Sequence, residues 1–172
     1  MTTVTTGSFK VYTYKAGLLS RLAHDLRLTL TRFEITFGDE AEGLPDAEAA
    51  QVRGRFWPAS LVVDGAVKKG SVDRSTPSAS DKKKIYGNIK DKILHTDQFP
   101  EITFEGKIDR GQVRGQLTMH GRTQPVVVQL LRGETYRGSV ELRPTRWGIP
   151  PFKAVGGAIK LQDRVRIEFD LA

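Results

Sequence analysis

The sequence predicts an all-β fold with one inserted helix, an antiparallel, up-and-down, eight-stranded β-barrel. Apolar and polar residues alternate with a period of two through most of the chain, which is typical of strands with one solvated face. Short connections link these stretches, so neighbouring strands are expected to pair as antiparallel hairpins. Residues 78–94 break the alternation with a helical repeat.

The alternating stretches give the strands in order. In HDLRLTLTRFEITF, residues 24–37, the apolar positions change parity near Thr31 and Arg32, which predicts a bulge or a strand end there. The segment PVVVQLL, residues 125–131, is apolar on both parities and predicts a strand covered on both sides. The other alternating stretches are EITFEGKID at 101–109, VRGQLTM at 113–119, TYRGSVEL at 135–142 and RVRIEFDL at 164–171.

The helix is expected in SASDKKKIYGNIKDKIL, residues 78–94. Ser78 is a suitable N-cap, and isoleucines at 85, 89 and 93 form an apolar stripe opposite a lysine-rich face. Those lysines are either simply solvated or positioned to meet an anionic membrane or a phosphorylated headgroup. Two long loops, acidic residues 38–50 and the Pro- and Gly-rich residues 144–160, are of the kind that is usually functional or mobile.

Composition sets the broad class. A chain of 172 residues, 38% hydrophobic, is expected to form a single domain over residues 1–172. A net charge of +7 attracts anionic partners without choosing among them, and the absence of cysteine excludes disulfides and thiolate zinc sites. With no leader pattern at the start of the chain, we expect a cytoplasmic protein, or a periplasmic one if a leader was removed.

Four glycines fall on the apolar parity of their strands, each after a charged residue. If that parity faces inward, Gly54, Gly106, Gly115 and Gly138 remove side chains from the interior, which lets strands bend and leaves space for a ligand cavity. The alternative is that they relieve crowding in a packed barrel that has no cavity. In both cases the arginines that precede three of them, Arg53, Arg114 and Arg137, are expected to face solvent.

Metal and enzyme chemistry find little support in the sequence. The three histidines, His24, His95 and His120, are scattered rather than at the local spacings of metal ligands, and no common catalytic motif is present. Binding of single-stranded nucleic acid stays as an alternative, because the barrel is basic and Trp57, Tyr12 and Tyr14 are candidates for base stacking.

Several stretches resemble the YceI-like family of polyisoprenoid-binding proteins. HGRTQP, residues 120–125, resembles the family's HGxTxP turn; DQFPEITFEGK, residues 97–107, resembles its FPxIxF segment; and RGRF, residues 53–56, resembles a strand near the N-terminal third. Their order and spacing also agree, and the resemblance covers nearly the whole chain. RPTRWGI, residues 143–149, departs from the family's NRSDFGI-like run, at a place where ligand ends or mouth loops would lie.

The resemblance implies a lipocalin-like barrel that holds an isoprenoid or fatty amphiphile, without a catalytic residue, cofactor or metal. The barrel would bind or carry this lipid without chemical change. Transient contact with an anionic membrane and a homodimer are left open. Trp147, Ile149 and Phe152 are expected at a mouth or lid. The remaining predicted lipid contacts are inward-facing: Val11, Leu28, Ile102, Phe104, Leu117, Met119, Val128, Val140, Leu142, Ile167 and Phe169.

Overall fold

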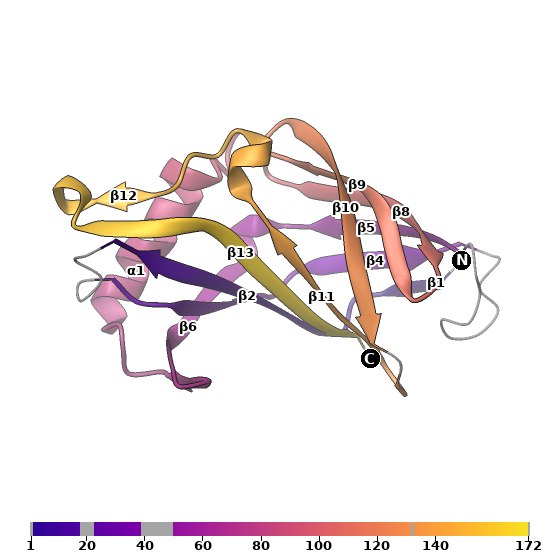
Figure 1. Ribbon diagram of the computed structural model, residues 1–172, viewed down its shortest axis with the longest axis horizontal. Coiled ribbons are helices and arrows are strands. Elements are labelled where there is room, and N and C mark those ends of the chain that lie inside the picture. The colour runs from indigo at the N-terminus through magenta and orange to yellow at the C-terminus, as the bar shows by residue number, and fades with distance from the viewer. Residues whose placement is uncertain (1, 18–22, 39–49, 132, 172) are drawn as a thin grey trace.

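The computed structural model describes residues 2–17, 23–38, 50–131 and 133–171, and it shows one antiparallel sheet curled around an interior space (Figure 1). Residues 39–49 of the acidic loop lie outside the described residues. The strands are β1 (Thr2–Val4), β2 (Gly7–Ala16), β3 (Leu26–Leu30), β4 (Phe33–Phe37), β5 (Gln51–Phe56), β6 (Leu61–Lys68), β7 (Ser71–Asp73), β8 (Ile102–Asp109), β9 (Gln112–Met119), β10 (Arg122–Leu131), β11 (Tyr136–Leu142), β12 (Lys153–Ala154) and β13 (Ile159–Leu171).

The sheet contains thirteen strand segments, more than the eight predicted, because long strands are interrupted. β1 and β2 pair with β4 and β3 in one register, since Thr2 lies opposite Phe37 and Phe9 opposite Leu30. β5 and β6 follow β4 and β3 with the turn η2 (Pro58–Ser60) between them. β1 and β2 therefore form one interrupted strand, as do β3 and β4, and β5 and β6. These three interrupted strands and β8, β9, β10, β11 and β13 form a circuit of eight, closed where β13 pairs with β2.

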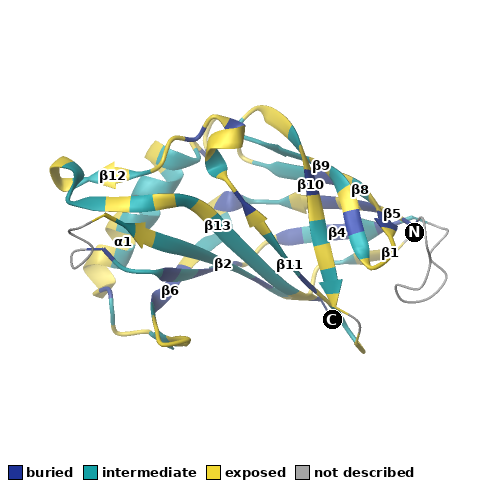
Figure 2. Cartoon of the chain, viewed as in Figure 1, coloured by how far each residue is buried: buried dark blue, intermediate teal, exposed yellow. Residues whose placement is uncertain are grey.

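The predicted change of parity near Thr31 and Arg32 is confirmed as the break between β3 and β4. On both sides of the break, alternate residues are buried, and Leu28 and Phe33 belong to the core (Figure 2). The prediction that β10 is covered on both sides is wrong. Val127 and Leu131 are exposed on the outer surface of the barrel, whereas Val126 is buried inside.

The predicted helix forms as α1 (Ala79–Asn88), followed by one π-helical turn, η3 (Ile89–Ile93). The Ser78 hydroxyl accepts a hydrogen bond from the Asp81 backbone N–H at 3.1 Å, as expected of an N-cap. Ile85 and Ile89 pack against a buried cluster of Leu26, Leu28 and Val63. The apolar stripe therefore attaches the helix to one end of the barrel. Among the described residues, no helix has the length and apolar character needed to cross a bilayer.

The four inward glycines do not open space, which corrects the first interpretation of them. A Cβ on Gly115 would lie 2.3 Å from the Glu105 carbonyl oxygen and 2.6 Å from the Phe104 ring. On Gly138 it would lie 2.6 Å from the Phe169 ring. The place of the missing side chains is taken by aromatic rings and by neighbouring backbone, so the glycines relieve local crowding. The barrel nevertheless has a cavity, so neither interpretation holds in full. Arg53, Arg114 and Arg137 are exposed, as predicted.

Candidate functional site

A cavity of about 690 Å³ occupies the interior of the barrel. This volume lies within the range of natural ligand pockets. Inward side chains from the strands form its wall, and α1, η3, residues 149–152 and residues 154–155 complete the wall at one end. Thirteen of the fourteen predicted lipid contacts lie on this wall, and their contact with a lipid stays a prediction. They are Val11, Leu28, Ile102, Phe104, Leu117, Met119, Val128, Val140, Leu142, Ile149, Phe152, Ile167 and Phe169.

Trp147 is the exception, because the structure places it in the core and not at a mouth. It ends the 3-10 turn η4 (Pro144–Trp147), it is fully buried, and its indole Nε1 donates a hydrogen bond to the Leu117 carbonyl at 2.9 Å. A buried indole needs such a partner. Trp147 therefore fixes η4 to β9, while Ile149 and Phe152, just after it, reach the cavity.

Apart from Tyr136, the polar residues of the wall gather at one end of the barrel. They come from the end of β2, the segment before β3, α1 and the first part of β13, on the side of the molecule away from both termini (Figure 1). We call this end the mouth. Its polar wall residues are Thr13, His24, Asp81, Lys84, Asn88, Gln162, Asp163 and Arg164.

Thr13 is unusual among these residues. Its hydroxyl oxygen is buried and has no hydrogen-bond partner in the part of the chain that the structure describes. A buried hydroxyl without a partner is unfavourable. Thr13 lies on the cavity wall. A polar group of a ligand at the mouth would supply the missing partner.

The charged groups of the mouth on β13 already have partners. Burial would raise the pKa of Asp163, but hydrogen bonds from the Thr145 hydroxyl and backbone N–H, together with the charge of Arg143, hold it below its usual value. Arg164 pairs with Glu141, and this hydrogen bond raises the pKa of its guanidinium. These pairs stabilise the fold around the mouth and leave little charge free for a ligand.

Sequence reasoning missed a large part of the wall. Ile85 and Ile89 were expected only as the packing face of a helix, yet they also line the cavity. The parity of the strands could have identified further members, because each shares a face with a residue that was predicted. These members include Phe9, Leu26, Leu30 and Val165. Ile35 and Phe37 also line the cavity, from β4, on which no contact was predicted.

The scattered histidines come closer together than the sequence indicated. The rings of His95 and His120 have centroids 5.6 Å apart, and Phe99 packs beside His120 with centroids 4.9 Å apart. Within the described ranges, no group of three or more His, Cys, Asp or Glu side chains is placed to hold a metal ion. His120 has φ of 53° and precedes Gly121 in the tight β9–β10 turn, as the sequence predicted.

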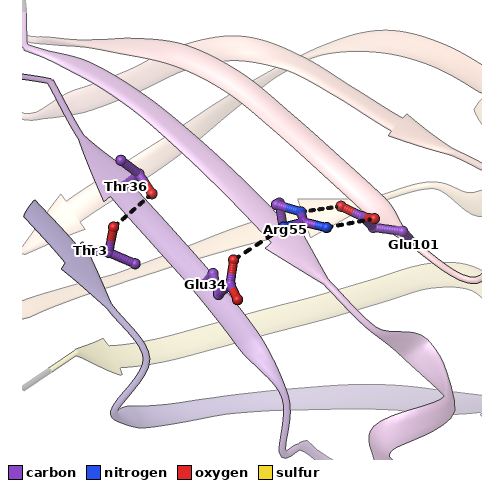
Figure 3. A network of polar contacts seen from close by, with 5 residues as sticks. All are labelled: Thr3, Glu34, Thr36, Arg55 and Glu101. Atoms are coloured by element: carbon purple, nitrogen blue, oxygen red, sulfur yellow. Dashed lines mark hydrogen bonds and ion pairs between the residues drawn. The ribbon is translucent and has the colours of Figure 1, made fainter. Parts of the chain in front are cut away.

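The aromatic residues on which the nucleic-acid alternative depended are largely occupied. The guanidinium of Arg32 lies 4.2 Å from the ring centroid of Trp57, and that of Arg55 lies 4.9 Å from it. Arg164 covers Tyr14 at 4.2 Å. Figure 3 shows Arg55 between Glu101 and Glu34, with hydrogen bonds of 2.5 Å and 3.4 Å to their carboxylates. The Arg55 hydrogen bond lowers the pKa of Glu101.

Comparison with known proteins agrees with this architecture. The sequence profile of the YceI-like domain matches residues 23–172. The chain belongs to the YceI-like family. No curated protein matches the sequence.

Solved structures place this YceI-like chain among similar folds. One is a polyisoprenoid binding domain from Saccharophagus degradans implicated in plant cell wall breakdown, with a TM-score of 0.58 and 10% identity over 98% of this chain and 93% of that one. Another is a mutant CJ YceI protein with a monobromobimane guest, at a TM-score of 0.46 and 12% identity over 71% and 70% of the two chains. At 10% identity the first structure supports the fold alone.

Proposed function

We propose that this YceI-like protein binds a long apolar amphiphile, an isoprenoid or a fatty chain, inside the barrel and carries it without chemical change. The observation that supports this most directly is the cavity of about 690 Å³ inside the barrel, whose wall is apolar apart from the mouth and Tyr136. Each Å² of apolar ligand surface removed from water contributes about 25 cal/mol, before the costs of ordering the ligand are subtracted. A long chain without charges matches such a wall.

The distribution of polar groups gives the ligand an orientation. The apolar chain extends from the mouth toward the opposite end, where Phe37, Leu130 and Leu171 line the wall. The polar head stays at the mouth, within reach of the unpartnered Thr13 hydroxyl. Because Asp163 and Arg164 are already paired, a head with hydrogen-bonding groups fits this end better than one that needs a cluster of free charges.

The test is a matched pair of substitutions on β10. Val128→Trp places a large side chain in the cavity, whereas Val127→Trp places the same side chain on the outer surface of the same strand. We expect Val128→Trp to weaken binding of a dansyl-labelled isoprenoid alcohol at least about tenfold, because the added ring displaces apolar contacts. Val127→Trp should bind like the parent protein.

Two further measurements serve as controls for this test. Val140→Phe fills the cavity with a smaller addition, in case the Val128→Trp barrel is overpacked and unfolds. Native mass spectrometry of the incubated complex should recover the alcohol with unchanged mass. Equal binding by all three variants, or an altered ligand mass, would reject the proposal.

A further inference from the structure

The turn beside the mouth combines an exposed apolar side chain with unpaired positive charge. Residues 152–160, which we call the mouth hairpin, contain β12, the 3-10 turn η5 (Val155–Gly157) and the start of β13. At its tip, Val155 is 69% exposed, more than Leu131 at 60% or Val62 at 50%. A β-branched residue with φ of 54° is uncommon, so the direction of the Val155 side chain is set by the backbone conformation of this turn.

Val155 also belongs to the rim of the cavity. Phe152, Ala154 and Val155 all line it, and α1 lines the same end with Lys84 and Asn88. The apolar surface therefore continues from the cavity wall to the solvent through the mouth hairpin. An amphiphile that leaves or enters the cavity at the mouth passes along this surface.

Positive charges outnumber negative ones around the tip. Lys153 lies directly opposite Lys160 in the β12–β13 pair, and both side chains are exposed. Neither lysine has an ion pair within the described part of the chain, and like charges at facing positions destabilise a sheet. α1 and η3 add the exposed lysines Lys83, Lys84 and Lys92 beside two exposed carboxylates, Asp81 and Asp91. Lys84 contacts Asp81 at 3.9 Å.

We infer that the mouth hairpin and the lysine-rich side of α1 form a docking surface for a bilayer that contains anionic lipid. An apolar tip among lysines is the combination that peripheral proteins use, since the tip inserts at the headgroup boundary and the lysines meet lipid phosphates. A protein interface needs a far larger contact area than this tip offers. Docking in this orientation turns the mouth toward the bilayer, and it builds on the proposed binding of an apolar amphiphile.

Co-sedimentation with vesicles tests this docking. The unmodified protein should sediment with vesicles of phosphatidylcholine and phosphatidylglycerol, less so as salt is added, and weakly with phosphatidylcholine alone. Replacing both Lys153 and Lys160 by Glu should reduce the bound fraction at least about tenfold. Val155→Asp should also reduce it, and Val155→Gly should do so while accommodating the positive φ.

Matched controls change the same properties at the far end of the barrel. Lys107→Glu combined with Arg110→Glu changes the net charge by the same amount, and Leu131→Asp removes another exposed apolar side chain. Both controls should retain vesicle binding. Equal losses in the controls, or no sedimentation of the unmodified protein, would overturn the docking surface.

A separate assay distinguishes this inference from the proposed function. Lys153 and Lys160 are not on the cavity wall, so the variant with Glu at both positions should bind the dansyl-labelled alcohol normally in the absence of vesicles. If the unmodified protein binds the alcohol normally but does not bind vesicles, the docking inference is rejected and the cavity function is not. Vesicle binding without alcohol binding rejects the cavity function, and with it the reason for docking.

Discussion

Inward glycines in this barrel have an aromatic ring beside them. Gly106 and Gly115 face each other across β8 and β9, and the Phe104 ring lies over both. A Cβ at either position would come within 2.7 Å of this ring and still closer to a backbone oxygen. The ring shields the glycine backbone and fills volume that two side chains would otherwise occupy. These glycines therefore serve packing, and the cavity begins beyond the ring.

Gly115→Ala should destabilise the barrel by about 1–3 kcal/mol, because the added methyl group meets backbone that cannot move without disturbing the sheet. The control is Gly87→Ala in α1, where nothing lies within 4 Å of the new Cβ. That change should stabilise the protein by about 0.5–1 kcal/mol through helix propensity. Urea unfolding measures both, and a neutral Gly115→Ala would show that the strands separate easily at this point.

Parity along a strand identifies which residues face inward, and this was enough to predict eleven members of the wall. It does not say what occupies the space next to them. Phe104 lies opposite Leu117 in the β8–β9 pair, yet its ring covers Gly115, two residues away along β9. Trp147 was misplaced for the same reason, since its hydrogen bond to Leu117 exists only after η4 has folded onto β9. Side-chain volumes depend on contacts that alternation does not encode.

At the scale of elements, one carboxylate of β13 holds η4 on the side away from its Trp147 contact with β9. Asp163 on β13 accepts hydrogen bonds from the Thr145 backbone N–H at 3.0 Å and from its hydroxyl at 2.5 Å, and Arg143 lies 3.5 Å away. These contacts favour the charged form and lower the pKa of Asp163 despite its burial. The turn that positions Ile149 and Phe152 at the cavity therefore depends on an ionised group.

Asp163→Asn should lower stability at pH 7 by about 1–2 kcal/mol through weakened hydrogen bonds. Because the folded-state pKa lies below the unfolded value of 3.8, the contribution of Asp163 is complete above that pH and is lost as pH falls through the folded pKa. The difference between the two proteins should therefore shrink below about pH 4. Urea midpoints across this range measure it.

Asp109→Asn is the matched control, since that carboxylate is exposed and its two arginine contacts are 3.8 Å and 3.9 Å long. It should change stability by less than about 0.5 kcal/mol at any of these pH values. A constant deficit for Asp163→Asn down to acidic pH would show that ionisation is not what anchors η4.

Helices and strands whose apolar residues repeat without interruption were predictable from the sequence, and those whose apolar pattern is interrupted were not. The helix was found because its isoleucines repeat at helical spacing around a capping serine. β6 was missed because Asp64 and Gly65 interrupt its apolar pattern. Asp64 is buried there, and its carboxylate accepts hydrogen bonds from the Arg27 guanidinium at 2.9 Å and the Thr29 hydroxyl at 2.6 Å. A shift of register between β3 and β6 lies beside these residues. A buried charge with partners on another strand looks like a loop residue in the sequence.

At the scale of the whole molecule, the two ends of the barrel differ. The sequence predicted a barrel, but it could not say that β13 would pair with β2 to close it or which loops would meet at one end. Closure brings the polar residues of β2, α1 and β13 together at the mouth, whereas the opposite end is apolar apart from Tyr136. This difference between the ends favours a ligand with one polar end over a ligand that is apolar throughout.

The finite volume of the cavity sets a length for the bound chain. At about 30 Å³ for each water-sized group, about 690 Å³ holds a chain of roughly 20 to 25 heavy atoms. In a series of straight-chain alcohols, affinity should rise about three- to fourfold for each methylene added, as expected for about 0.8 kcal/mol per buried group. The rise should stop near the length that fills the cavity, because further carbons remain at the mouth in water. Displacement of the dansyl-labelled alcohol measures the series, and Val128→Trp should move the plateau to shorter chains. A rise that continues unchanged beyond this length would mean that the barrel expands or that the chains bind outside it.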